Sequence, residues 1–113
     1  MKLRILGCSG GIGRDLRTTS MLLDDDVLID AGTGVGDLSI EQLKRIDHVF
    51  LTHSHLDHVN GLVLSAGSMG GQKLIHARKQ TIKDLEVIFA DRLWPKLASH
   101  KKEDPNAMLV YSP

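Results

Sequence analysis

The chain has 113 residues, of which 42% are hydrophobic and 25% are charged, and this composition is typical of a soluble globular protein with its own core. The 14 basic residues balance the 14 acidic ones, so net charge gives no reason to expect nucleic acid or a membrane surface as the partner. The single cysteine, Cys8, excludes an internal disulfide and fits a reducing compartment. We therefore expect one domain, residues 1–113, in the cytoplasm and without a membrane segment.

The amino-terminal segment predicts three strands followed by a short helix. Residues 2–7, KLRILG, run into a glycine-rich stretch, as a strand does when it enters a loop. Two apolar runs, residues 21–23 and 27–29, flank the acidic triplet 24–26, so we expect a β-hairpin with a solvated turn. Residues 37–46 carry apolar side chains at helical spacing, and Ser39 stands three positions before Gln42, which is the pattern of a capped helix.

The rest of the chain predicts alternating strands and helices. Residues 48–52, HVFLT, have the pattern of a buried strand, and a helix is expected in the segment that follows residue 58. Another strand is expected at 73–77, an amphipathic helix at 81–97 that Pro95 ends or kinks, and a last strand at 108–112. This alternation favours an α/β fold class.

The glycine-rich segment GCSGGIG, residues 7–13, contains the G-x-S-x-G pattern of a nucleophile elbow, in which Ser9 would be the nucleophile. An elbow needs a helix directly after the serine, but a polar segment broken by glycine follows here. We interpret the segment as a tight turn that leaves the first strand close to other backbone, with Cys8 as a small buried residue.

The segment THSHLDH, residues 52–58, places three histidines and one aspartate directly after the strand expected at 48–52. Imidazole and carboxylate groups that converge on one point are the usual ligands of zinc and similar divalent ions. His53 and His55 can present their rings to one side, and Asp57 and His58 can reach a second point nearby. The spacing suggests two metal ions about 3.5–4 Å apart.

The other three histidines have simpler interpretations. His48 begins the expected strand and is interpreted as a strand-entry side chain. His76 and His100 lie in separate segments and are expected to be structural or solvated residues, not metal ligands.

The segments THSHLDHVNGL and VLIDAGTG resemble the H-x-H-x-D-H signature and the preceding strand-Asp-x-Gly element of the metallo-β-lactamase superfamily. Leu56 within the signature, the lead-in RTTSMLLDDD and the segment RLWP are most similar to the class II 3′,5′-cyclic-nucleotide phosphodiesterases. The resemblance implies an α/β fold of the α+β sandwich type, with this chain as the amino-terminal half of a metallo-β-lactamase αβ/βα fold.

The resemblance also implies the roles of the site residues. His53 and His55 would bind the first metal, and Asp57 and His58 the second, with two Zn²⁺ per complete site and Mn²⁺ or Fe as other suitable ions. Asp57 would also be catalytic, because it would orient a hydroxide that bridges the metals and attacks phosphorus. Asp30 would brace the ligand-bearing loop without touching metal, and the alternative is a carboxylate that caps the turn in DAGTG.

Members of this superfamily have two similar halves, and the second half carries the remaining ligands. The resemblance therefore implies a metal-dependent hydrolase of a small phosphodiester that is incomplete as this chain alone. We expect its apolar sheet face to need either a carboxyl-terminal half or a homodimer partner. The alternatives are a non-catalytic metal-binding or self-associating domain, and a hydrolase of the same superfamily for a thioester, a lactone or an RNA 3′ end.

Overall fold

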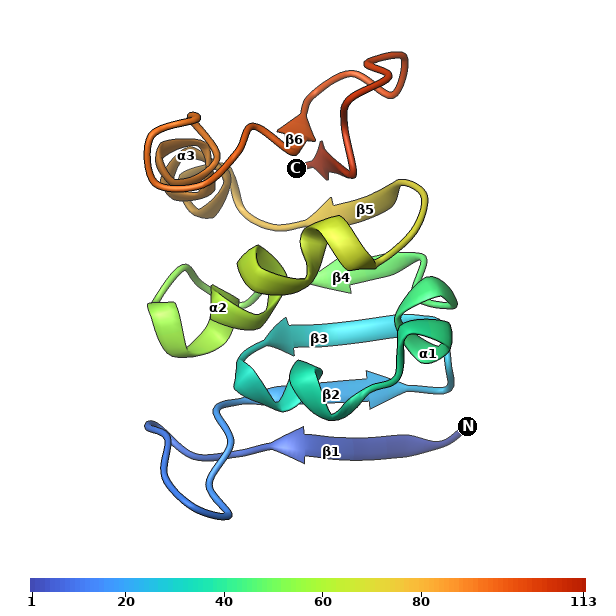
Figure 1. The fold of residues 1–113 in the computed structure, drawn as a ribbon, viewed down its shortest axis with the longest axis vertical. Coiled ribbons are helices and arrows are strands. Elements are labelled where there is room, and N and C mark those ends of the chain that lie inside the picture. The colour runs from blue at the N-terminus through green and yellow to red at the C-terminus, as the bar shows by residue number, and fades with distance from the viewer.

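Seven strands form one mixed sheet in the computed structural model, which describes residues 1–113 (Figure 1). The strands are β1 (Leu3–Gly7), β2 (Ser20–Leu23), β3 (Val27–Ala31), β4 (His48–Phe50), β5 (Lys73–His76), β6 (Ala98–Ser99) and β7 (Leu109–Ser112). Their order in the sheet is β1-β2-β3-β4-β5-β7-β6. Pairing is antiparallel from β1 to β3 and parallel from β3 to β6, so the expected hairpin and the α/β alternation are both confirmed.

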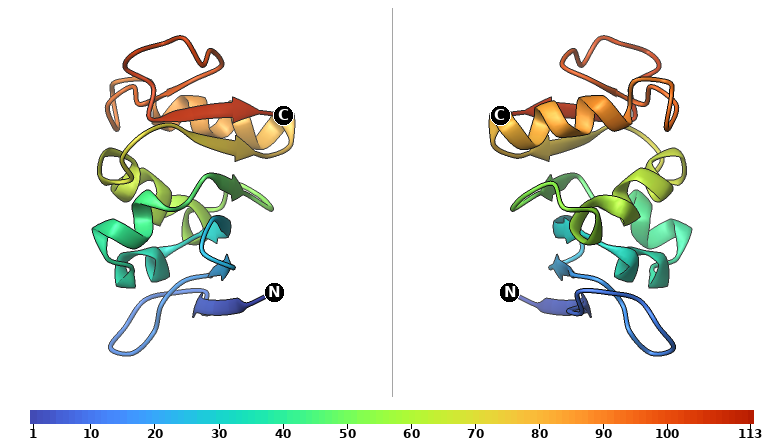
Figure 2. Two further views of the ribbon diagram at one scale, coloured as in Figure 1. Left: turned by 90° about the vertical axis from the view of Figure 1, so that its right-hand side faces the viewer. Right: turned by 90° about the vertical axis from the view of Figure 1, so that its left-hand side faces the viewer.

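Helices connect the strands and cover one face of the sheet. They are α1 (Ile40–Lys44), α2 (Leu56–Ser65) and α3 (Lys79–Ile88), with 3₁₀ turns η1 (Thr33–Asp37) and η2 (Ala66–Ser68). Both views in Figure 2 show α1 and α2 on the same side of the strands. On that side, Leu28, Val49 and Ile75 from neighbouring strands are fully buried, and they form the centre of the core.

The opposite face of the sheet has no helix over its amino-terminal half, and it carries exposed apolar side chains. Ile5 is 55% exposed and Phe50 is 44% exposed. The expectation that β4 is a buried strand is therefore wrong for two of its residues, since only Val49 is buried. Exposed apolar side chains on one face are typical of a surface that another polypeptide covers.

The short helix α1 begins at the predicted cap. Ser39 Oγ accepts a hydrogen bond from the Gln42 backbone N–H at 3.1 Å, and Gln42 Oε1 accepts one from the Ser39 N–H at 2.9 Å. These two bonds satisfy donors that a helix amino terminus otherwise leaves free. A five-residue helix is not stable alone, so these bonds and the burial of Leu43 hold it on the sheet.

The helix predicted at 81–97 is too long, because α3 ends at Ile88, well before Pro95. Phe89 leaves the helical conformation with ψ 34° and is buried, and Asp91 has φ 70°. The apolar spacing continues to Leu93, but that side chain is 70% exposed. Directly after the predicted helix, Ala98–Ser99 form the short strand β6, which the sequence pattern did not indicate.

The end of β1 lies close to another backbone segment, as the glycine-rich sequence predicts. A Cβ atom at Gly7 would overlap the carbonyl oxygen of Thr18, so only glycine fits there. The Ser9 N–H donates to the Arg17 carbonyl at 2.9 Å, and no helix follows Ser9, which excludes the nucleophile elbow. Cys8 is exposed, so the expectation that it is buried is wrong. No helix in the structure combines the length and apolar character that crossing a membrane requires.

Candidate metal centre

The histidine-rich segment lies beside the carboxyl end of β3, at the edge where parallel strands in α/β proteins commonly place their chemistry (Figure 1). β4 ends at Phe50, Thr52 follows, and α2 begins at Leu56. The segment therefore joins a strand to a helix, as its sequence indicates. Asp57 lies in the first turn of α2, where its negative charge interacts favourably with the positive end of the helix dipole. The same charge offsets the repulsion that this end of the helix would exert on a bound cation.

Asp30 supports this segment from the end of β3. Its side chain is 2% exposed, and its Oδ1 accepts the Thr52 backbone N–H at 2.9 Å. Its Oδ2 accepts the Thr52 hydroxyl at 2.9 Å and lies 2.9 Å from His58 Nδ1. The carboxylate thus bonds to the histidine-rich segment and not to the turn in DAGTG. That turn is held by a reciprocal pair, in which Thr33 and Thr18 each donate a backbone N–H to the other's hydroxyl.

Three side chains converge on one point. One ligand atom from each of His53, Asp57 and His58 lies within 4.8 Å of the other two, and all three side chains are half-buried. The rings of His53 and His58 have centroids 4.1 Å apart. Asp30 forms a hydrogen bond with Nδ1 of His58, so the other ring nitrogen, Nε2, has no bond to Asp30 and lies 3.5 Å from Asp57 Oδ2.

His55 lies beside this group without joining it. Its ring is edge-on to that of His53, with centroids 4.7 Å apart. His55 precedes α2 with ψ 142°, whereas Asp57 and His58 lie in the helix. The sequence pattern pairs His53 with His55, but the structure brings His53 to Asp57 and His58. Two nitrogens and one carboxylate in a half-buried setting are a donor set that suits Zn²⁺ and is compatible with Mn²⁺ and Fe.

The sequence pattern did not reveal that α3 anchors the middle of the loop. Ser54 Oγ donates to Asp84 Oδ2 at 2.5 Å, and Gln80 Nε2 donates to Asp84 Oδ1 at 3.2 Å. The Gln80–Asp84 spacing is a helical i,i+4 pair and could have been noticed, but nothing local links either residue to Ser54.

Helix α2 contacts the loop after β3 through glycine. A Cβ atom at Gly61 would overlap the carbonyl oxygen of Gly32, and a Cβ atom at Gly32 would overlap Thr18 and the Asp57 carbonyl. The two glycines therefore allow the helix that carries Asp57 and His58 to lie directly against the loop that follows Asp30 and β3.

The remaining histidines lie outside the metal group. His48 Nδ1 lies 2.9 Å from His76 Nε2 on the open face of the sheet, and the Phe50 ring stacks on His76 at 4.4 Å. Burial lowers the pKa of His76, and the neighbouring His48 lowers it further. His100 Nε2 pairs with Glu86 Oε1 at 2.9 Å at the surface. These contacts agree with structural or solvated roles.

The sequence is similar to that of known proteins. The family model "cAMP phosphodiesterases class-II" matches residues 38–111. A 3′,5′-cyclic-nucleotide phosphodiesterase of Aliivibrio fischeri is 29% identical over 123 aligned positions, which cover 83% of this chain and 37% of that protein. Ribonuclease Z of Methanopyrus kandleri is 34% identical, and the aligned positions cover 76% of this chain and 37% of that protein.

Solved structures show the same fold. Unliganded yeast PDE1 superposes with a TM-score of 0.72 at 20% identity, over 97% of this chain and 49% of that one. The metallo-beta-lactamase fold protein YhfI of Bacillus subtilis has a TM-score of 0.53 at 22% identity, over 76% of this chain and 39% of its own. This chain thus spans about half or less of the length of these proteins. On the match over residues 38–111, it belongs to the class II cyclic AMP phosphodiesterase family and has a metallo-β-lactamase fold.

Proposed function

We propose that this chain supplies one half of the metal-dependent active site of a cyclic-nucleotide phosphodiesterase. The observation that carries the proposal is the convergence of His53, Asp57 and His58 beside the buried carboxylate of Asp30. Family membership supports a phosphodiesterase, and the names of the relatives support a 3′,5′-cyclic nucleotide as the small-molecule substrate.

His53, Asp57 and His58 would hold a divalent ion, with His55 as a further ligand and two Zn²⁺ in the complete site. Bound divalent ions supply a strong nucleophile from water at neutral pH and offset the charge that develops on phosphoryl oxygens. Asp57 would accept a hydrogen bond from the attacking water and orient it toward phosphorus. Asp30 would hold the proton on His58 Nδ1, so that Nε2 keeps its lone pair for metal.

We also propose that a second half of the fold covers the open face of the sheet. That face is apolar and exposed at Ile5 and Phe50. Yeast PDE1 has a further half with no counterpart in these 113 residues. The covering polypeptide would add the remaining metal ligands and the walls of the substrate pocket. A second copy of this chain in the same place is the alternative that sizing can detect.

Two other functions have specific support. The similarity to Ribonuclease Z favours a hydrolase of the same superfamily that acts on an RNA 3′ end. The exposed apolar face favours a non-catalytic metal-binding domain that self-associates. Two rates distinguish these functions from the main proposal: the rate of hydrolysis of cyclic AMP and the rate of hydrolysis of an RNA substrate. Both are measured on the chain together with a covering half.

The first experiment measures metal binding by the purified chain. We expect calorimetry with Zn²⁺ to show weak binding that His53→Ala and His58→Ala abolish and that His100→Ala, a matched control at the surface, leaves unchanged. We expect little hydrolysis of cyclic AMP by the isolated chain. Zn²⁺ binding that survives in both site variants would overturn the metal assignment. Rapid hydrolysis of cyclic AMP by a chain that light scattering shows to be a monomer would overturn the proposal that the chain supplies only half of the active site.

A further inference from the structure

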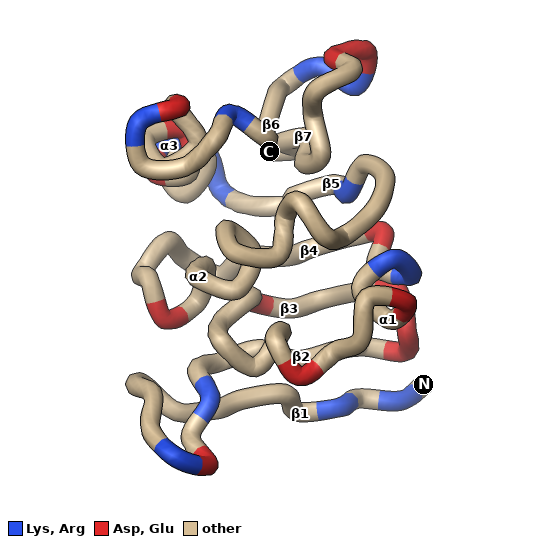
Figure 3. The backbone as a smooth tube through the Cα atoms, viewed as in Figure 1, with Lys and Arg blue, Asp and Glu red and all other residues tan.

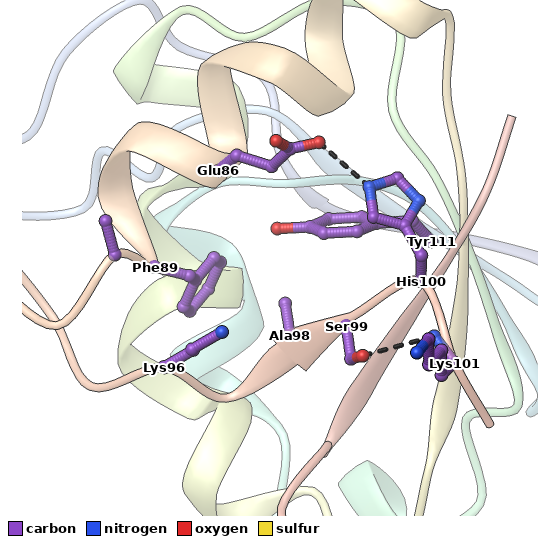
Figure 4. A pocket seen from close by; sticks show the side chains of 9 residues that line it. Glu86, Phe89, Lys96, Ala98, Ser99, His100, Lys101 and Tyr111 are labelled. Atoms are coloured by element: carbon purple, nitrogen blue, oxygen red, sulfur yellow. Dashed lines mark hydrogen bonds and ion pairs between the residues drawn. The ribbon is translucent and has the colours of Figure 1, made fainter. Parts of the chain in front are cut away.

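A cavity of about 470 Å³ lies between α3, β6 and β7 (Figure 4). This volume is within the usual range for pockets that bind small molecules. None of its lining residues belongs to the metal group. Asp84 bonds to the metal loop, whereas Glu86, two residues later, lines the cavity. Residues two apart project about 200° from each other around a helix, so the cavity and the metal loop lie on different sides of α3.

The cavity contains a buried hydroxyl that lacks a partner. Tyr111 is 6% exposed, and its hydroxyl makes no hydrogen bond within the protein. Figure 4 shows the hydroxyl pointing into the space between Phe89 and the Glu86–His100 pair. A buried polar group without a partner destabilises the folded state, and such groups are rare in native structures. Burial raises the pKa of Tyr111, and Glu86 raises it further, so the hydroxyl is a hydrogen-bond donor across the physiological range.

The charges around the cavity favour an anion. Lys96 and Lys101 line it, and neither forms an ion pair within the protein. The one lining carboxylate, Glu86, is already paired with His100 at 2.9 Å. Phe89 and Ala98 supply an apolar surface.

We propose that this cavity is a binding site for a small organic anion, separate from the metal centre. The apolar or aromatic part of the ligand would lie against Phe89, and its carboxylate or phosphate would lie near the lysines. An oxygen of the ligand would accept a hydrogen bond from the Tyr111 hydroxyl. The hydroxyl is almost out of reach of solvent, so binding requires exposed side chains of the lining to move aside. Rotamer changes of exposed side chains are fast and cost little.

The test uses NMR titration of the purified chain in EDTA, so that its result does not depend on metal binding or on the proposed phosphodiesterase activity. The probes are phenyl phosphate and benzoate, with benzyl alcohol as the uncharged control. We expect at least one anion to shift the amide signals of residues 86–111 with a dissociation constant of about 1 mM, and benzyl alcohol to bind more weakly. The tighter of the two anions identifies the headgroup.

Variants test the two parts of the site. Tyr111→Phe removes only the hydroxyl, so we expect about fivefold to tenfold weaker binding with an unchanged or higher thermal midpoint. Lys96→Ala is expected to weaken binding of the anion, whereas Lys102→Ala, which makes the same charge change outside the lining, is not. No signal shift with either anion up to about 10 mM would overturn the proposal. Wild-type affinity for the anion in Tyr111→Phe would also overturn it. A lower thermal midpoint in Tyr111→Phe would overturn it too, because it would indicate a purely structural role for the hydroxyl.

Discussion

Asp30 Oδ2 lies 2.9 Å from His58 Nδ1, and this contact joins the end of β3 to the first turn of α2. The same carboxylate accepts the Thr52 N–H and hydroxyl, so one buried side chain fixes both ends of the histidine segment. Asp30 adopts φ 56°, a conformation that costs about 1–3 kcal/mol in a residue other than glycine. Hydrogen bonds to a charged group offset that cost, so Asp30 orders the histidine segment that we propose as the metal site.

The first prediction concerns the carboxylate of Asp30. In Asp30→Asn an NH₂ group replaces one oxygen, so either Thr52 or His58 loses its acceptor. We expect Zn²⁺ affinity to fall about 10- to 100-fold and the free energy of unfolding to fall by about 1–3 kcal/mol. Calorimetry and urea denaturation measure the two effects. Asp25→Asn, in the exposed hairpin turn, is the control, and wild-type Zn²⁺ affinity in Asp30→Asn would show that Asp30 does not orient His58.

The second prediction separates the two histidines of the H-x-H pair. His53 belongs to the converging group and His55 lies beside it. In the isolated chain we expect His53→Ala to abolish detectable Zn²⁺ binding and His55→Ala to weaken it without abolishing it. Calorimetry under identical conditions compares them. Equal losses would mean that both rings bind the same ion, as the sequence pattern alone suggests.

The third prediction concerns the contact between α2 and the loop after β3. Gly61→Ala places a methyl group on the Gly32 carbonyl, so α2 must shift, and we expect a loss of about 1–3 kcal/mol or more in the free energy of unfolding. Gly67→Ala is the matched control, because a Cβ atom there meets nothing within 4 Å. Chemical denaturation measures both variants. A neutral Gly61→Ala would contradict the close approach of Gly61 to Gly32.

Features encoded in a few adjacent residues were predictable from the sequence. The acidic triplet 24–26 indicates the hairpin, Ser39 and Gln42 indicate the start of α1, and the segment 52–58 indicates that His53, Asp57 and His58 lie close together. In each case the interacting residues are neighbours in the chain, so local chemistry determines the outcome.

Features that depend on tertiary packing were not predictable. The apolar spacing that suggests a helix to Pro95 continues past Ile88, but the burial of Phe89 and the left-handed Asp91 end the helix earlier. The Ser54–Asp84 bond and the His48–His76 contact link residues 30 and 28 positions apart. No single-sequence pattern encodes such pairs, because the sheet order and the position of α3 decide which side chains meet.

The fourth prediction concerns the anchor between Ser54 and α3. Asp84→Asn replaces a charged acceptor with a neutral one, so the bond from Ser54 weakens. We expect a loss of about 0.5–1.5 kcal/mol in the free energy of unfolding, together with a modest decrease in Zn²⁺ affinity as the loop gains freedom. Asp91→Asn is the control, since Asp91 is exposed and Asn tolerates its φ of 70°. If Asp84→Asn behaves like this control, Ser54 does not depend on α3 for its position.

The last prediction concerns His76 on the open face of the sheet. Burial lowers the pKa of His76, and His48 lowers it further, so the folded protein binds a proton there less readily than the unfolded chain. Stability is therefore full above the unfolded pKa of about 6.5 and declines as the pH falls from that value toward the lower folded pKa. We expect His76→Gln to show a smaller loss of unfolding free energy than wild type between about pH 7.5 and about pH 5.5, as measured by urea denaturation. His100→Gln, at the surface, is the control and is expected to retain the wild-type decline. An undiminished decline in His76→Gln would show that another group senses pH in this range.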